Sequence, residues 1–161
     1  MANLITEYKN GHKIVQAEAR HIPHLAKNMR EADIIEVNCF TGDPAKALFN
    51  GLMNDDHTFT LMDSMHVPYA MFGAGTVNKE AYIWMLGTDD IVKYKRFFIK
   101  ICRAWVNVLV NKYSTVFNFV HEDNKLAIRW LEWCGAVLGE EVIVKNERFY
   151  QFKITKKEKL L

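Results

Sequence analysis

The residues best suited to acid–base chemistry are His121, Glu122 and Asp123, which follow the β-branched and aromatic run 115–120. A histidine titrates near neutral pH, so His121 is a candidate general base at the end of a strand. The same cluster is typical of a polar loop before a helix, with Asp123 or Asn124 as the N-cap. The sequence leaves both interpretations open.

A second candidate site is the turn that joins the apolar run 82–86 to a long amphipathic segment, 91–112. Strand 115–120 follows that segment, and two strands joined by so long a helix lie parallel or skip a neighbour. In such units a ligand sits beyond the carboxyl end of the first strand, where backbone N–H groups begin the next helix. We therefore expect any ligand to lie at residues 87–95.

The sequence predicts no metal site. His21 and His24 could share a helical face, but no third ligand is evident. Cys39, Cys102 and Cys134 have no metal-ligand spacing, and their odd number is typical of reduced thiols in the cytoplasm.

The remaining elements follow from apolar periodicity and turn residues. We expect an α/β fold, more specifically a mixed α+β sheet that is mostly antiparallel, with a single crossover at its centre. The expected elements, in order, are strand 13–18, a helix from Pro23 toward Ile35, helix 45–53 capped by Asp43, hairpin 58–63 and 67–74, strand 82–86, helix 91–112, strand 115–120, helix 124–133 and hairpin 141–144 and 148–154.

The composition bears on three classes of function: nucleic-acid binding, membrane insertion and secretion. The chain has 161 residues, 50% of them apolar, and a formal net charge of +2, which does not favour specific nucleic-acid binding. No apolar stretch reaches membrane-spanning length, and the first residues do not look like a signal peptide. We expect a single domain over 1–161, with its core at about 13–155 and a basic tail at 156–161.

The order of elements, read with the pattern Asn124-x-x-Ala127-Ile128-x-Trp130 and Gly135, resembles the Gcn5-related N-acetyltransferase (GNAT) superfamily. Three motifs are similar to proteins of tailed bacteriophages with that fold, including an internal virion protein of short-tailed phages. These motifs are residues 84–89 (WMLGTD), residues 127–135 (AIRWLEWCG) and residues 28–36 (NMREADIIE).

The resemblance implies acetyl-coenzyme A as cofactor, bound by the turn and by the start of the last helix. The residues implied are Leu86, Gly87, Thr88, Ile91, Val92, Lys93 and Asn124. The turn departs from the pattern of active relatives, which is rich in glycine, because Asp89 and Asp90 place two carboxylates where phosphate would bind. The two carboxylates stabilise the helix without a ligand, through capping and through the helix dipole. Lys93, Lys95 and Arg96 offset part of their repulsion of phosphate.

The resemblance also bears on catalysis. Relatives often carry a glutamate on or near the fourth strand as general base, and Glu80 is the nearest match, although a solvated loop residue is the alternative. A tyrosine seven residues after the asparagine often protonates the departing thiolate, but Leu131 stands there. Asp33 and Glu36 fall in the region that borders the substrate groove of relatives, and the alternative is that they lie on an exposed helix.

Two functions follow. The first is a phage component, associated with the virion or ejected with the genome, that keeps a degenerate acetyltransferase site and works through contacts with virion or host proteins. The second is an acetyl-coenzyme A-dependent N-acetyltransferase that acts on a protein or a small amine. In either case the expected location is the host cytoplasm, with packaging into the virion in the first.

Overall fold

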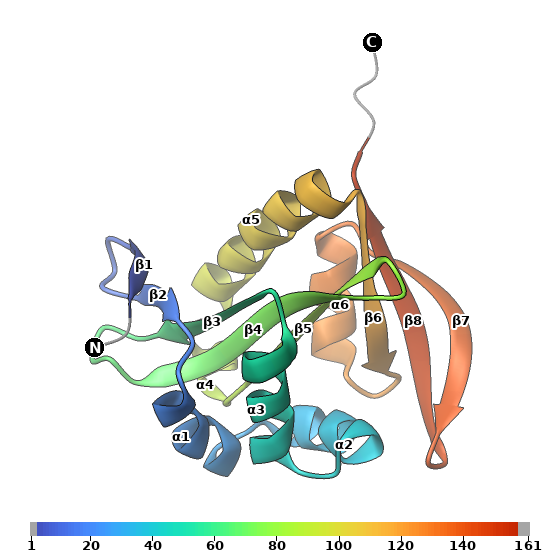
Figure 1. Ribbon diagram of the computed structural model, residues 1–161, viewed down its shortest axis with the longest axis horizontal. Coiled ribbons are helices and arrows are strands. Elements are labelled where there is room, and N and C mark those ends of the chain that lie inside the picture. Colours follow the sequence, from blue (N-terminus) through green and yellow to red (C-terminus); the bar gives the residue numbers. More distant parts are fainter. Residues whose placement is uncertain (1–2, 158–161) are drawn as a thin grey trace.

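One mixed β-sheet organises the chain, and the computed structural model describes residues 3–157 (Figure 1). Within these residues the sheet has eight strands in the order β1-β2-β3-β4-β5-β6-β8-β7. The strands are β1 Leu4–Glu7, β2 Lys13–Gln16, β3 His57–Met62, β4 Pro68–Val77, β5 Glu80–Gly87, β6 Thr115–His121, β7 Val137–Val144 and β8 Glu147–Thr155. The helices are α1 Ile22–Lys27, α2 Glu31–Phe40, α3 Pro44–Asn54, α4 Asp90–Lys93, α5 Lys95–Tyr113 and α6 Lys125–Trp133, with a short 3₁₀ turn at Ala19–His21.

The pairing of β5 with β6 is parallel, whereas the other neighbouring strands described are antiparallel. The predicted crossover is therefore confirmed: α4 and α5 carry the chain from the end of β5 back to the start of β6. The predicted hairpins β3–β4 and β7–β8 are also present. The carboxyl end of β5 thus meets the start of α4, as the ligand-site argument requires.

Local chemistry sets several of the element ends. The Asp43 side chain accepts a hydrogen bond from Ala45 N and caps α3, as predicted. Asn124 caps α6 by accepting from Ala127 N at 3.4 Å. Gly135 has φ +98°, a left-handed conformation that suits glycine just after a helix.

The predicted helix from Pro23 toward Ile35 is wrong, because the chain breaks between α1 and α2. Met29 forms an isolated β-bridge with Thr88, and Arg30 N donates to Gly87 O at 2.9 Å. Arg30 is extended, with φ −56° and ψ 142°. Pairing with the end of β5 therefore outweighs helical continuation here.

Two further predictions need correction. Helix 91–112 is divided at Tyr94 into α4 and α5. Strand β1 was not predicted, because its four residues are all exposed and carry no burial pattern, and it pairs with β2 at the edge of the sheet. The final hairpin also begins earlier than expected, at Val137.

Helices cover both faces of the sheet (Figure 1). Helices α1, α2 and α3 pack with Met71 and Leu86 on one face. On the other face, Ile91 and Phe98 pack with Ala70 and Phe72 of β4. A third cluster joins α5, β6 and β8 through Val106, Val116 and Phe152, and Ile128 and Leu131 of α6 pack against it.

Candidate functional site

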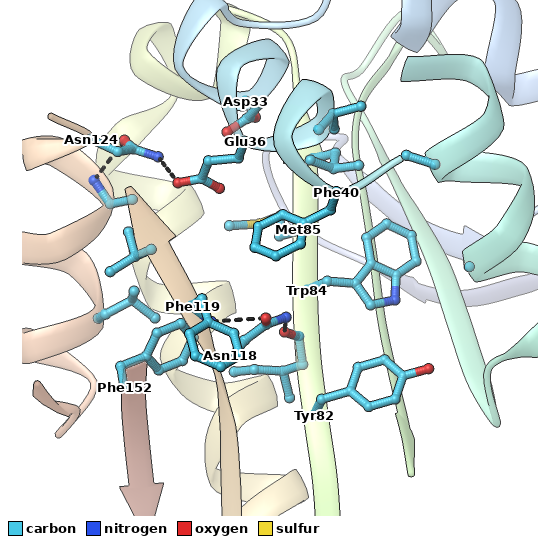
Figure 2. A pocket seen from close by; sticks show the side chains of 18 of the residues that line it. Asp33, Glu36, Phe40, Tyr82, Trp84, Met85, Asn118, Phe119, Asn124 and Phe152 are labelled. Carbon is cyan, nitrogen blue, oxygen red and sulfur yellow. Dashed lines mark hydrogen bonds between the residues drawn. The ribbon is translucent and has the colours of Figure 1, made fainter. Parts of the chain in front are cut away.

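The candidate site is a cavity of about 500 Å³ between β5 and β6 (Figure 2). The two strands pair only at Ala81–Val116 and Tyr82–Phe117 and then diverge. Side chains from α2, α3, α5 and α6 enclose the space that opens. The volume is in the range of small-molecule sites in proteins.

Two carboxylates of α2, Asp33 and Glu36, form the polar end of the cavity (Figure 2). Asp33 Oδ1 lies 3.5 Å from Arg30 Nη1, and its Oδ2 accepts from Gly87 N at 3.0 Å. Glu36 Oε1 accepts from Asn124 Nδ2 at 3.1 Å and from His121 N at 3.0 Å. Arg30 Nη2 donates to Asn124 Oδ1 at 3.4 Å, which closes the network.

Both carboxyl groups bind a proton more readily than an exposed carboxyl group, because their pKa values are raised. Burial raises the pKa of Asp33 to about 7, with help from the charges of Glu36 and Asp89, although Arg30 and the Gly87 N–H act in the opposite direction. Burial also raises the pKa of Glu36 against its hydrogen bonds from His121 and Asn124. A carboxyl group with a pKa near 7 is suited to general acid–base work at neutral pH.

An aromatic wall faces α3 and β4. Trp84 Nε1 and the Tyr82 hydroxyl both donate to the Asp55 carboxylate. A Cβ on Gly51 would collide with the Trp84 ring, and a Cβ on Gly73 would lie 2.8 Å from Trp84 Nε1. These two glycines therefore make room for the indole, and Asp55 fixes its orientation.

The backbone N–H groups of the turn after β5 are largely engaged within the protein. Gly87 N donates to Asp33 Oδ2, and Thr88 N donates to Tyr69 O at 3.0 Å. Asp90 N donates to the Thr88 hydroxyl at 3.2 Å. A phosphate group would have to displace these bonds to be held by the same amides.

Capping of the first turn of α4 differs from the sequence prediction. Asp89 is the N-cap, but its side chain makes no capping hydrogen bond. The Thr88 side chain takes that role for Asp90 N. The carboxylates of Asp89 and Asp90 therefore act on this helix end through charge, because the hydroxyl of Thr88 already satisfies the donor.

Gly87 is required where β5 meets α4. A Cβ there would collide with Ile91 Cδ1 and lie 2.7 Å from Tyr69 O, a backbone atom of β4. We expect Gly87→Ala to lower the free energy of unfolding by about 1–3 kcal/mol through overpacking, as measured by urea denaturation. Gly139→Ala is the control, since its Cβ would make only ordinary contact at 3.5 Å from Gln151 O. Equal stability of the two variants would contradict this account.

His121 lies at the end of β6, as predicted, but outside the lining of the cavity. The side chain is 3% exposed, and both ring nitrogens have partners. Nδ1 accepts from Asp123 N at 3.1 Å, and Nε2 lies 2.5 Å from Glu147 Oε2. These contacts favour the polar-loop interpretation over a free general base.

Glu80 is the first residue of β5 and is exposed. It pairs with Val77 across a two-residue turn formed by Asn78 and Lys79, and it does not line the cavity. Its position favours the solvated interpretation. A role of Glu80 or His121 in catalysis remains an expectation from sequence.

Only some of the residues expected to hold a cofactor line the cavity. Leu86, Ile91 and Asn124 line the cavity. Gly87 and Thr88 lie at the end of β5 next to them, and Val92 and Lys93 are exposed on α4. The structure therefore brings the first three together at one cavity.

The sequence interpretation that α2 is exposed misses the acidic centre of the site. Asp33 is 4% exposed and Arg30 is also buried. The buried residues of α2 are Asp33, Val37 and Cys39, so the helix has no apolar stripe to reveal which face turns inward. The signals in the sequence were the three-residue spacing of Asp33 and Glu36 and their place in the region that borders the substrate groove of relatives.

The described part of the chain shows neither a metal-binding cluster nor a membrane-spanning helix. Over residues 3–157, no group of three or more His, Cys, Asp or Glu side chains is placed to hold a metal ion. In the same part of the chain, no helix combines the length and apolar character needed to cross a membrane.

Sequence comparison relates the chain to phage proteins. Residues 59–143, just over half of the chain, match the family described as bacteriophage T7 probable scaffold protein Gp13. The chain belongs to this family. The probable scaffold protein gp13 of Escherichia phage T7 is 34% identical over 77 residues. That match covers 45% of this chain and 55% of the phage T7 protein, so it spans about half the length of that relative.

Structural comparison shows that this Gp13-family chain has the GNAT fold, which confirms the predicted fold class. A GNAT-family acetyltransferase from Bacillus anthracis superposes with a TM-score of 0.68 at 12% identity, covering 94% of this chain and 98% of the other. The ribosomal-protein-S18-alanine N-acetyltransferase of Escherichia coli gives 0.61 at 17% identity, with coverages of 93% and 99%. Spermidine N-acetyltransferase from Vibrio cholerae, in complex with CoA and spermine, gives 0.65 at 13% identity, with coverages of 90% and 95%.

Proposed function

We propose that this chain is a scaffold-type or virion-associated phage protein that keeps the GNAT fold without efficient acetyl transfer. It acts through contacts with virion or host proteins, either in the host cytoplasm or inside the particle. Membership of the Gp13 family supports the phage role. The backbone N–H groups of the turn already donate to Asp33, Tyr69 and Thr88. This observation supports the proposal that the turn does not bind the cofactor.

The charges around the turn support the same conclusion. Asp89 and Asp90 stand at the start of α4, and Asp33 lies behind Gly87. Carboxylates at a helix N-terminus stabilise the helix but repel a phosphate group. The residues present therefore do not fit the pyrophosphate of coenzyme A.

The proton needed by a leaving thiolate also has no evident source at the predicted position. Leu131 lines the cavity seven residues after Asn124 and has no proton to donate. The site thus lacks both the phosphate cradle and the acid that the resemblance to active relatives implies.

Titration calorimetry with acetyl-coenzyme A tests the proposal. We expect no binding at micromolar levels by the wild-type protein. A gain of binding when Asp89 and Asp90 are both changed to Asn would assign the loss to their charges, whereas no gain would assign it to the engaged amides. Asp123→Asn is the matched control, because it removes one carboxylate at the start of another helix. Micromolar binding by the wild type, together with turnover on a panel of amines, would overturn the proposal.

The particle provides an independent test of the phage role. We expect the protein to be detected by mass spectrometry in phage particles or in their assembly intermediates. Its absence from both would contradict a scaffold-type or virion-associated role.

The second candidate is an acetyl-coenzyme A-dependent N-acetyltransferase, and the polar end of the cavity is the observation that favours it. Asp33, with a pKa of about 7, would take a proton from an amine at neutral pH. Asn124 lies in the same network, 3.1 Å from Glu36. If the wild type shows turnover, Asp33→Asn and Asn124→Ala should each abolish it.

A further inference from the structure

The outer face of α5 is positively charged. The helix carries five Lys or Arg side chains and no Asp or Glu in its 19 residues. Three of these cations, Arg96, Lys100 and Arg103, are exposed and follow one another at intervals of four and three residues, so they share one side of the helix. Like charges at these spacings repel one another and lower helix stability. The fold of α5 itself therefore gives no reason for the arrangement.

Acidic side chains within the protein do not compensate this row of charge. In the part of the chain that the structure describes, the cations of the ion pairs are Lys13, Arg20, Arg30, His121 and Arg148, and none of them lies on α5 or α6. An isolated surface cation is satisfied by water. A like-charged row that lies against an exposed aromatic side chain has the composition of a contact surface.

Trp133 of α6 is the aromatic side chain that lies against the row. It is 47% exposed, although α6 packs on the core through Ile128 and Leu131. The Arg103 guanidinium stacks over the indole ring, 4.3 Å from the ring centroid. Stacking fixes both side chains before a partner arrives, so less conformational entropy is lost on binding. Trp and Arg are also the residues that most often dominate the energy of protein interfaces.

Arg129 extends the charged surface onto α6. It is exposed and precedes Trp133 by four residues, so it lies on the side of α6 that carries the indole ring. The surface therefore presents four cations around one aromatic ring. We call it the basic surface, and its residues are Arg96, Lys100, Arg103, Arg129 and Trp133.

The extent of the basic surface favours a short acidic segment over a continuous polyanion. Arg96 and Arg103 are seven residues apart, which is about 10 Å along a helix. Carboxylates border the surface, since Asp89 and Asp90 stand at the start of α4 and Glu132 adjoins the tryptophan. A nucleic-acid strand would carry its phosphates past these carboxylates, and the net charge of the chain is only +2. A short helix with carboxylates at matching intervals meets the cations and stops before the acidic border.

We propose that the basic surface is the docking site for a short, acidic, amphipathic segment of another protein. Carboxylates of the segment pair with Arg96, Lys100 and Arg103, and an apolar side chain covers the exposed part of Trp133. This inference rests on the proposed function, because it gives the chemistry of a protein contact through which the chain acts. None of the five residues of the basic surface lines the cavity, so docking and the cavity are separate.

An NMR titration with a helical peptide tests the basic surface. The probe is a capped, alanine-based peptide with one leucine and with glutamates at positions i, i+4 and i+7, and the control peptide has glutamines in their place. We expect the acidic peptide to shift the indole N–H signal of Trp133 and to bind roughly tenfold or more tightly than the glutamine peptide. Raising the salt concentration from about 50 to about 300 mM should weaken binding by roughly fivefold, because exposed charges are screened.

A double variant tests the cations. Lys100→Gln combined with Arg103→Gln should bind the acidic peptide roughly tenfold more weakly than the wild type, because two of the facing charges are lost. Lys27→Gln combined with Lys46→Gln is the matched control, since it removes two exposed cations from α1 and α3 and should leave the affinity unchanged. All four side chains are exposed, so both double variants should fold as the wild type does.

Several outcomes would overturn this inference. They are the absence of a shift with the acidic peptide, equal binding of the two peptides, and an unchanged affinity in the variant of Lys100 and Arg103. Displacement of the peptide by coenzyme A would assign the surface to the cofactor instead. Shifts of the Trp133 signal caused only by a single-stranded oligonucleotide, or only by a higher protein concentration, would assign it to nucleic acid or to a second copy.

The peptide titration fails or succeeds independently of the proposed function. It uses the purified protein and does not depend on whether phage particles contain it. Absence of the protein from particles and from assembly intermediates would overturn the proposed function. Presence there, together with no peptide binding, would overturn only the docking site.

Discussion

Raising the pH from about 4 to about 8 is expected to lower the free energy of unfolding through Asp33, by roughly 4 kcal/mol for this one group. Its pKa is about 7 in the folded protein, compared with 3.8 for an unperturbed aspartate side chain. The folded state therefore binds more protons between these two values, so stability is greatest below the lower value and is lost as the pH rises through the higher one. Urea unfolding followed across this pH range measures the slope.

Asp33→Asn isolates the contribution of this carboxyl group. The variant keeps an oxygen for the Gly87 N–H but cannot ionise, so its stability should fall less steeply with pH than that of the wild type. Glu31→Gln, an exposed change in the same helix, should keep the wild-type slope. A wild-type slope in Asp33→Asn would show that burial does not raise the pKa of Asp33.

Phe98→Ala should cause the largest loss of stability through packing. The ring is 1% exposed, belongs to the cluster with Leu61 and Ile91, and lies 5.0 Å from the Trp130 ring at the cavity wall. Its removal leaves a hole beneath α5, and the expected loss is about 3–5 kcal/mol in free energy of unfolding by urea denaturation.

Val108→Ala provides the control on the same helix. Its side chain is 64% exposed, so little burial is lost, and the change in stability should stay within about 0.5 kcal/mol. A loss of less than about 1 kcal/mol in Phe98→Ala would mean that α5 is not anchored by this ring.

Short-range patterns account for the parts of the fold that could be predicted. The caps Asp43 and Asn124 bond to residues two or three positions away, and the hairpin 57–77 turns within a few residues. The crossover follows from the length of segment 91–112 between two strands. Each of these is fixed by chain geometry and local hydrogen bonding, which periodicity reports directly.

The candidate site depends on contacts between residues that are far apart in the chain. Gly87 N bonds to Asp33, and Asn124 bonds to Arg30 and Glu36, across gaps that a sequence pattern does not encode. The break at Met29 and Arg30 has the same origin, since it exists only because the end of β5 offers a partner. Helix propensity is small per residue and yields to such pairing.

The sequence by itself therefore determined the central crossover, the two hairpins, the GNAT-like fold and the acidic turn at Asp89 and Asp90. Only the tertiary structure decided that Asp33 is buried, that His121 binds Glu147 outside the cavity, and that Asn118 bridges two strands. The physical reason is that burial and strand pairing are set by what the opposite element presents. A residue type states which bonds it can make, and the assembled fold decides which partner it meets.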